Sequence, residues 1–98
     1  MTLEKREEII GYYDTYGILL TEKQKAYFES YYFDDLSITE IASNFDVSRN
    51  AVFDQLKRVN AILLDYEKKL HFVEKLSQIE AIELPEELKE KIMNLLRE

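Results

Sequence analysis

The stretch ITEIASNFDVSRNAV, residues 38–52, has the pattern of two short helices joined by a tight turn. Ser37 and Glu40 form an S-x-x-E capping box, which typically begins a helix. Ser48 is a strong N-cap residue for the second helix. Asp46 stands at the turn between them, where aspartate is one of the residues that tolerate a left-handed backbone. The pattern predicts a helix-turn-helix.

The apolar residues of this stretch suit a close crossing of two helices. Ala42 is a small residue at the position where the helices would meet. Four apolar side chains stand at offsets that lock the pair at a fixed angle: Ile41, Phe45, Val47 and Val52. Gln55 occupies a position where many such motifs carry an apolar residue, so we expect Leu56 to provide the packing there.

The composition predicts an all-α fold. Two glycines and one proline among 98 residues are too few for a turn-rich β fold. Periodic apolar residues predict a first helix over about 3–16 that stops near Gly17. A T-x-x-Q capping box at Thr21 predicts the start of a second helix that continues to about Phe33.

The second half of the chain is expected to contain one long helix. No helix breaker follows Ser48 until Pro85, which suits the first turn of a final helix. We therefore expect a helix-turn-helix domain over residues 1–75, in which a long helix extends from the recognition helix. Residues 76–98 are expected to form a C-terminal amphipathic helix or tail.

Several kinds of active site lack their residues in this chain. There is no cysteine, and His71 is the only histidine, so cysteine-based zinc sites and histidine-dependent triads or metal clusters cannot be assembled. The pair Asp34–Asp35 is better explained as a helix-ending loop than as an acid–base pair or a cation site. We expect no enzyme activity, metal or cofactor.

A cytoplasmic location without membrane insertion is also expected, since no apolar run approaches the ~20 residues of a membrane span.

The formal net charge is −7, and it is unevenly distributed along the chain. Residues 1–36 hold four Lys or Arg against eight Asp or Glu, which gives −4, and residues 76–98 hold three against six, which gives −3. Residues 37–58 and 59–75 each hold three against three and are neutral. The acidity therefore lies outside the predicted motif.

The helix after the turn carries side chains suited to nucleic acid. The predicted base contacts come from Arg49, Asn50 and Gln55, and the predicted phosphate contacts come from Ser48, Lys57 and Arg58. Three cations are few beside the roughly 6–10 phosphate contacts of a tight duplex binder. We therefore expect a homodimer that binds two half-sites.

A seam of apolar residues offers a candidate dimer interface. Its members are spaced 4, 3, 4, 3, 4, 3 along the chain: Val52, Leu56, Val59, Leu63, Tyr66, Leu70 and Val73. The first two belong to the motif core, so the predicted interface comprises Val59, Leu63, Tyr66, Leu70 and Val73. The alternative is that this stripe packs on the first or last helix of its own chain.

Six tyrosines fall in the first two predicted helices: Tyr12, Tyr13, Tyr16, Tyr27, Tyr31 and Tyr32. One interpretation is that their rings stack on the bases of a single strand. Their helical spacing and acidic surroundings favour the other interpretation. In it, the rings pack the two helices together and the hydroxyl groups reach water.

The chain also resembles the YlxM-like helix-turn-helix family of Firmicute bacteria over about residues 3–75. The most specific matching pieces are YYFDDLS, EIA, VSR and YEKKLH. The resemblance implies a fold like the DNA-binding region 4 of sigma factors, and it maps Ser48 and Arg49 to the start of the recognition helix. Family genes lie beside those of the signal recognition particle, which implies a role in that pathway. Asp46 in place of glycine and Asp54 on the outward face depart from the pattern.

Two classes of function follow. In the favoured one, a dimer binds DNA, or alternatively RNA, and regulates a gene or an RNA-containing particle. In the other, the motif is a retained fold, and the acidic N-terminal and C-terminal helices dock on a basic protein such as a signal recognition particle component.

Overall fold

The computed structural model describes residues 2–97, and all regular structure in that range is helical. The elements in chain order are α1 (Leu3–Tyr16), the 3-10 helix η1 (Gly17–Leu19), α2 (Glu22–Tyr32), α3 (Ile38–Phe45), α4 (Arg49–Leu70), α5 (Phe72–Glu80) and α6 (Glu86–Arg97). The all-α prediction is confirmed. None of the described helices combines the length and apolarity needed to cross a membrane.

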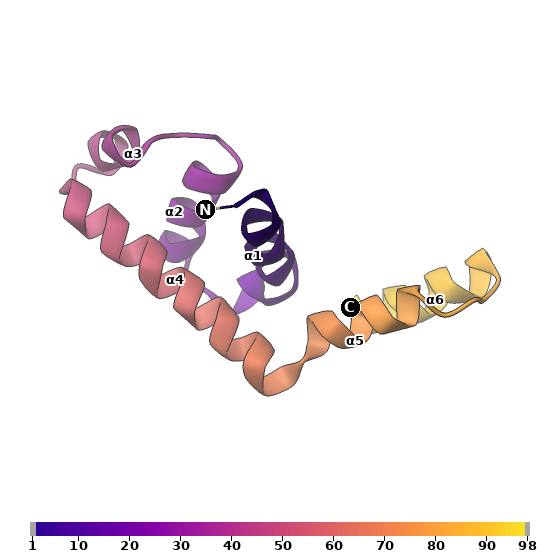
Figure 1. Cartoon of the computed structure of the whole chain (residues 1–98). Coiled ribbons are helices and arrows are strands. Elements are labelled where there is room, and N and C mark those ends of the chain that lie inside the picture. Colours follow the sequence, from indigo (N-terminus) through magenta and orange to yellow (C-terminus); the bar gives the residue numbers. More distant parts are fainter. Residues whose placement is uncertain (1, 98) are drawn as a thin grey trace.

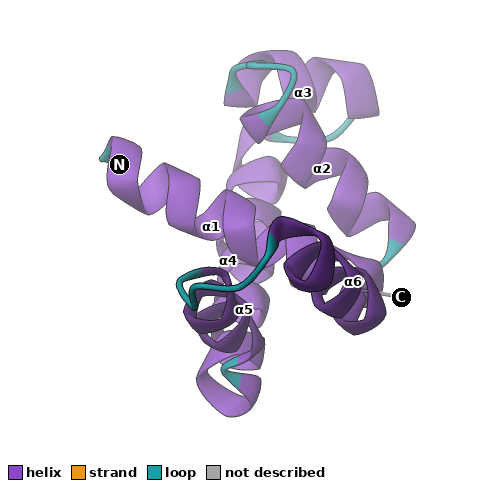
Figure 2. Ribbon diagram, turned by 90° about the vertical axis from the view of Figure 1, so that its right-hand side faces the viewer, coloured by secondary structure: helices purple, strands orange, loops and turns teal. Residues whose placement is uncertain are grey.

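Helix α4 is the central helix of the fold, because α1, α2 and α3 all pack against it (Figure 1). Helices α5 and α6 lie against each other and form an arm that projects beyond the end of α4 (Figures 1 and 2). The radius of gyration is 15.8 Å and the principal extents are 50 × 26 × 25 Å. A compact domain of about 100 residues has a radius of gyration of about 13 Å, so the arm makes the molecule elongated.

Side-chain caps begin three helices where the sequence predicts them. The Thr21 hydroxyl accepts a hydrogen bond from the Gln24 N–H, and the Gln24 side chain accepts one from the Thr21 N–H. Ser37 and Glu40 make the same reciprocal pair at the start of α3. The Ser48 hydroxyl accepts from the backbone N–H three residues later, at 3.1 Å, and begins α4. These bonds satisfy N–H groups that a helix start otherwise leaves without a partner.

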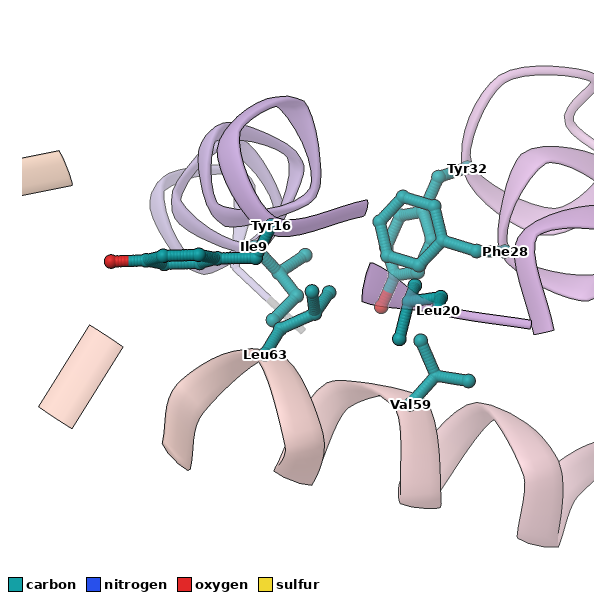
Figure 3. Packing of buried hydrophobic residues seen from close by; sticks show 7 residues of the cluster. All are labelled: Ile9, Tyr16, Leu20, Phe28, Tyr32, Val59 and Leu63. Carbon is teal, nitrogen blue, oxygen red and sulfur yellow. The ribbon is translucent and has the colours of Figure 1, made fainter. Parts of the chain in front are cut away.

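The larger apolar cluster joins α1, α2 and α4 (Figure 3). Its buried members are Ile9, Tyr16, Leu20, Phe28, Tyr32, Val59 and Leu63. Phe28 stacks on Tyr13 and on Tyr32, with ring centroids 4.2 and 4.3 Å apart. Figure 3 shows Leu63 and Val59 rising from α4 toward Ile9 and Leu20. The cluster therefore fixes α4 against the first two helices.

Much of the predicted dimer seam is buried in the core of its own chain. Val59 and Leu63 have exposed fractions of 0%, so the intramolecular alternative is correct for these two side chains. Tyr66 is partly buried, whereas Leu70 is 51% exposed and Val73 lies beyond the end of α4, on α5. An interface formed by all five residues along one straight helix is therefore wrong. Self-association itself stays a prediction.

The expected uninterrupted helix from Ser48 toward Pro85 is also wrong. Helix α4 ends at Leu70, because His71 adopts a left-handed conformation with φ 54° and ψ 27°. The backbone turns there and α5 begins, so the bend precedes the predicted domain boundary at residue 75. The division into two folding units stays a prediction.

A hydrogen-bonded network across the core holds this bend. The Glu67 carboxylate accepts hydrogen bonds from the N–H groups of Val73 and Glu74, at 3.0 and 3.1 Å, and from the Tyr16 hydroxyl. The Tyr16 oxygen in turn accepts from the Phe72 N–H at 3.1 Å. The start of α5 is thus capped by residues of α4 and α1, and a cap formed this way has no local sequence signature.

The tyrosines pack as helical core residues, but several hydroxyl groups bond to protein groups where water was expected. The Tyr12 hydroxyl donates to Glu8 at 2.8 Å, and the Tyr32 hydroxyl accepts from Asn60 at 3.0 Å. Burial, followed by the Glu8 carboxylate, raises the pKa of Tyr12 to about 12. Burial and the Glu29 carboxylate raise the pKa of Tyr13 to about 12.

The protein is expected to lose stability as the pH rises from about 10 to about 12. Unfolded tyrosine ionises near its ordinary pKa of 10.0, whereas folded Tyr12 and Tyr13 keep their protons up to about pH 12. The folded chain binds more protons in this interval, so stability present below pH 10 is lost through it. Urea midpoints at pH 9, 10 and 11 measure the loss, and Tyr12→Phe should reduce it. A folded protein whose absorbance at 295 nm shows every tyrosine titrating near pH 10 would contradict this prediction.

Candidate nucleic-acid interface

Helices α3 and α4 form the helix-turn-helix that the sequence predicts. A second apolar cluster joins them to α2, and its buried members are Tyr27, Ile41, Ala42, Val52 and Leu56. Ile41 and Val52 are fully buried, and Ala42 is 6% exposed at the crossing. Leu56 is 7% exposed and provides the packing expected of it. Tyr27 belongs to this cluster, where its ring lies 4.7 Å from that of Phe45.

The turn between the two helices depends on a left-handed residue. Asp46 has φ 55° and ψ 48°, as the sequence predicts, and its N–H bonds back to carbonyl groups of α3. The next N–H, from Val47, donates to the Ala42 carbonyl at 3.0 Å. These bonds close the end of α3 and direct the chain into α4.

Asp46→Gly is expected to stabilise the protein by about 0.5–1 kcal/mol. A left-handed conformation costs about 1–2 kcal/mol for a residue with a Cβ, and the greater unfolded entropy of glycine offsets part of the gain. The urea midpoint should rise with an unchanged m-value. Asp54→Gly, inside α4, is the matched control and should lose about 0.1–0.5 kcal/mol, the difference between aspartate and glycine in helix propensity. A lower midpoint for Asp46→Gly would show that its carboxylate stabilises the turn.

Four of the six predicted site residues lie exposed on the first three turns of α4: Arg49, Asn50, Lys57 and Arg58. Ser48 is exposed as well, and its hydroxyl oxygen caps the helix. The structure thus brings these five side chains to one end of the molecule. Asp54 is exposed among them and brings one negative charge to this face.

Gln55, the sixth predicted site residue, is not exposed with the other five. Its side chain is partly buried, and its Oε1 atom is enclosed without a hydrogen-bond partner among the described residues. The cause is helical geometry, because Gln55 lies one turn from the buried residues Val52 and Val59. The predicted base contact from Gln55 is therefore not supported by where the structure places it.

Phe53 is the surface residue that the sequence interpretation missed. It is 50% exposed, four residues from both Arg49 and Lys57, and the Lys57 Nζ lies 5.6 Å from its ring centroid. The signal available in the sequence was the i, i+4 spacing that places Phe53 on the same helix face as Arg49 and Lys57. An open hollow of about 540 Å³ lies beside it, lined by Ile38, Ser48, Arg49, Asn50 and Phe53.

Comparison with known proteins identifies the family. The family described as "UPF0122: Putative helix-turn-helix protein, YlxM / p13 like" matches residues 3–97. The chain belongs to this family. The resemblance found from the sequence motifs is therefore confirmed, and it extends over the α5–α6 arm.

Individual relatives come from several Firmicute genera. A UPF0122 protein of Streptococcus mutans is 52% identical over 71 residues, which cover 72% of this chain and 64% of the relative. One of Lactiplantibacillus plantarum is 49% identical over 86 residues, covering 84% of this chain and 75% of the relative. One of Bacillus cereus is 49% identical over 76 residues, covering 78% and 69%. The match with the Streptococcus mutans protein thus spans less than two thirds of that relative's length.

Proposed function

We propose that this protein is a non-enzymatic, cytoplasmic regulator that binds duplex DNA through α3 and α4. The observation that carries the proposal is the cluster of exposed Arg49, Lys57 and Arg58 on the first turns of α4, in a chain whose net charge is −7. The net negative charge lies in residues 1–36 and 76–98, so this end of the molecule is better suited to phosphate groups than either of those segments.

In this proposal the first turns of α4 enter the major groove while α3 crosses the sugar–phosphate backbone. Arg49 and Asn50 stand at the start of α4 and contact base edges, for which arginine pairs with guanine and asparagine with adenine. Lys57 and Arg58 lie two turns further along and contact phosphate groups. Ser48 adds a phosphate contact from its hydroxyl O–H, since its oxygen already caps the helix.

Tight binding requires two copies of the chain. Three cations neutralise few phosphates, and a two-fold dimer doubles their number and spaces two recognition helices about 34 Å apart. Leu70, which is 51% exposed at the end of α4, is the residue of the predicted seam most open to a second copy. Sedimentation should show twice the chain mass of 11.7 kDa at micromolar concentration, and a persistent 11.7 kDa species would contradict dimerisation.

The decisive experiment is selection of fragments from a sheared bacterial genome by the purified protein at ~0.15 M salt, where screening is near physiological. Enrichment of a short sequence with two-fold related halves is the expected result. No enrichment above background would contradict duplex recognition. A matched selection from total RNA distinguishes the RNA alternative.

A second candidate function rests on the exposed acidic side chains of the terminal helices. Glu7 and Glu8 of α1 and Glu86 and Glu87 of α6 are all exposed, so each pair offers negative charge to a basic protein. The family resemblance suggests a component of the signal recognition particle as that partner. Changing the four glutamates to glutamine should weaken this association and leave DNA binding unreduced.

A further inference from the structure

Phe53 is an apolar group placed among the cations of the proposed DNA-binding face. Isolated exposed apolar residues are common and carry no meaning by themselves. Phe53, however, lines one hollow together with Ile38 of α3 and with Arg49 and Asn50 of α4. The Lys57 Nζ lies 5.6 Å from the centroid of the Phe53 ring and adds a second positive charge beside it. The face therefore presents an apolar patch inside a polar and cationic border.

The major groove offers one kind of apolar group that fits such a patch. Thymine carries a C5 methyl group there, and phenylalanine is one of the side chains that contact it. Asparagine pairs with the N6 and N7 atoms of adenine in the same groove. Asn50 and Phe53 are three residues apart on a helix, so they are neighbours on one side of it. Their separation suits the same or adjacent base pairs.

We propose that Phe53 contacts thymine methyl groups in the major groove beside an adenine bound by Asn50. The half-site therefore contains A·T pairs at the positions that face the start of α4. The proposal rests on the proposed function, because it requires α4 to lie in the major groove. It adds what that function leaves open, namely which bases the surface distinguishes.

The test separates the methyl group from all other features of the site. A pool of duplexes with 20 random base pairs is selected with the full chain, and the enriched duplex is then synthesised with deoxyuridine at one thymine position at a time. Deoxyuridine keeps the hydrogen-bonding groups of thymine and lacks only the methyl group. Wild-type affinity should fall about fourfold at one or two positions, the amount expected for exposing one buried CH2-sized group.

Phe53→Ala should bind the thymine duplex more weakly than wild type and bind the thymine and deoxyuridine duplexes equally. The matched control is Leu64→Ala, since Leu64 is 49% exposed on the same helix, three turns further along. It should keep the wild-type difference between the two duplexes. Circular dichroism melting checks that both variants fold, which half-exposed positions permit.

Each result decides between the two proposals. If the wild-type protein selects no duplex, both the DNA-binding function and this inference fail. If it selects a duplex but deoxyuridine weakens binding at no position, only this inference fails. Unchanged thymine preference in Phe53→Ala, or a preference for RNA duplexes of the selected sequence, would likewise overturn it. The major groove of an RNA helix is too narrow for this contact.

Discussion

Leu63→Ala is expected to lower the free energy of unfolding by about 2–5 kcal/mol, the range measured for buried leucines. Leu63 is fully buried and lies in the cluster formed with Ile9 and Tyr16 of α1 (Figure 3). Removing its side chain leaves a cavity that α1 and α4 cannot easily fill, since both are held by other members of the cluster. Urea unfolding followed by circular dichroism measures the loss.

Leu64→Ala provides the matched control, because it removes the same atoms from the next position, which is 49% exposed. It should change stability by less than about 1 kcal/mol, as surface substitutions usually do. The difference between the wild-type and Leu63→Ala midpoints should also be the same at all protein concentrations, because the packing of Leu63 lies within one chain. Equal losses for Leu63→Ala and Leu64→Ala, or a Leu63→Ala loss that disappears on dilution, would instead place Leu63 in a dimer interface.

The double variant Arg49→Ala/Lys57→Ala is expected to abolish specific DNA binding at physiological salt. Loss of a base-contacting arginine costs about 1–3 kcal/mol and relaxes specificity at one position. Loss of a phosphate-contacting lysine weakens binding to all sequences and reduces the slope of log affinity against log salt by about 1. Because one motif offers only three cations, the remaining Arg58 cannot compensate. Fluorescence anisotropy with the selected duplex at several salt concentrations measures both effects.

Lys75→Ala/Lys91→Ala is the control for the change in total charge. It also removes two positive charges, but from exposed positions on α5 and α6, away from the candidate interface. It should bind the selected duplex nearly as well as wild type. If the two double variants lose affinity equally, the α4 face does not direct binding. If neither loses affinity, the groove-binding role of Arg49 and Lys57 is wrong.

The helix starts and the left-handed turn could be predicted from the sequence because their causes are local. The caps at Thr21, Ser37 and Ser48 each join groups three residues apart, so the pattern that predicts them also contains the interacting atoms. The left-handed conformation of Asp46 follows from a polar turn residue between two capped helices. The exposure of Arg49, Asn50, Lys57 and Arg58 follows from the geometry of one helix after the Ser48 cap, and their contacts with nucleic acid stay a prediction.

The sequence by itself determined the helical class and the helix-turn-helix, because short-range capping and apolar periodicity specify them. The family followed from a resemblance carried by specific motif pieces such as YYFDDLS and YEKKLH. Only the tertiary structure decided where α4 ends and which elements pack on its apolar face. The bend at His71 depends on a hydrogen bond between Tyr16 and Glu67, 51 residues apart, and no local pattern contains both partners. The same packing buries Val59 in the chain's own core. An amphipathic stripe shows that a helix has an apolar face. Which element packs on that face depends on chain segments that are distant in sequence.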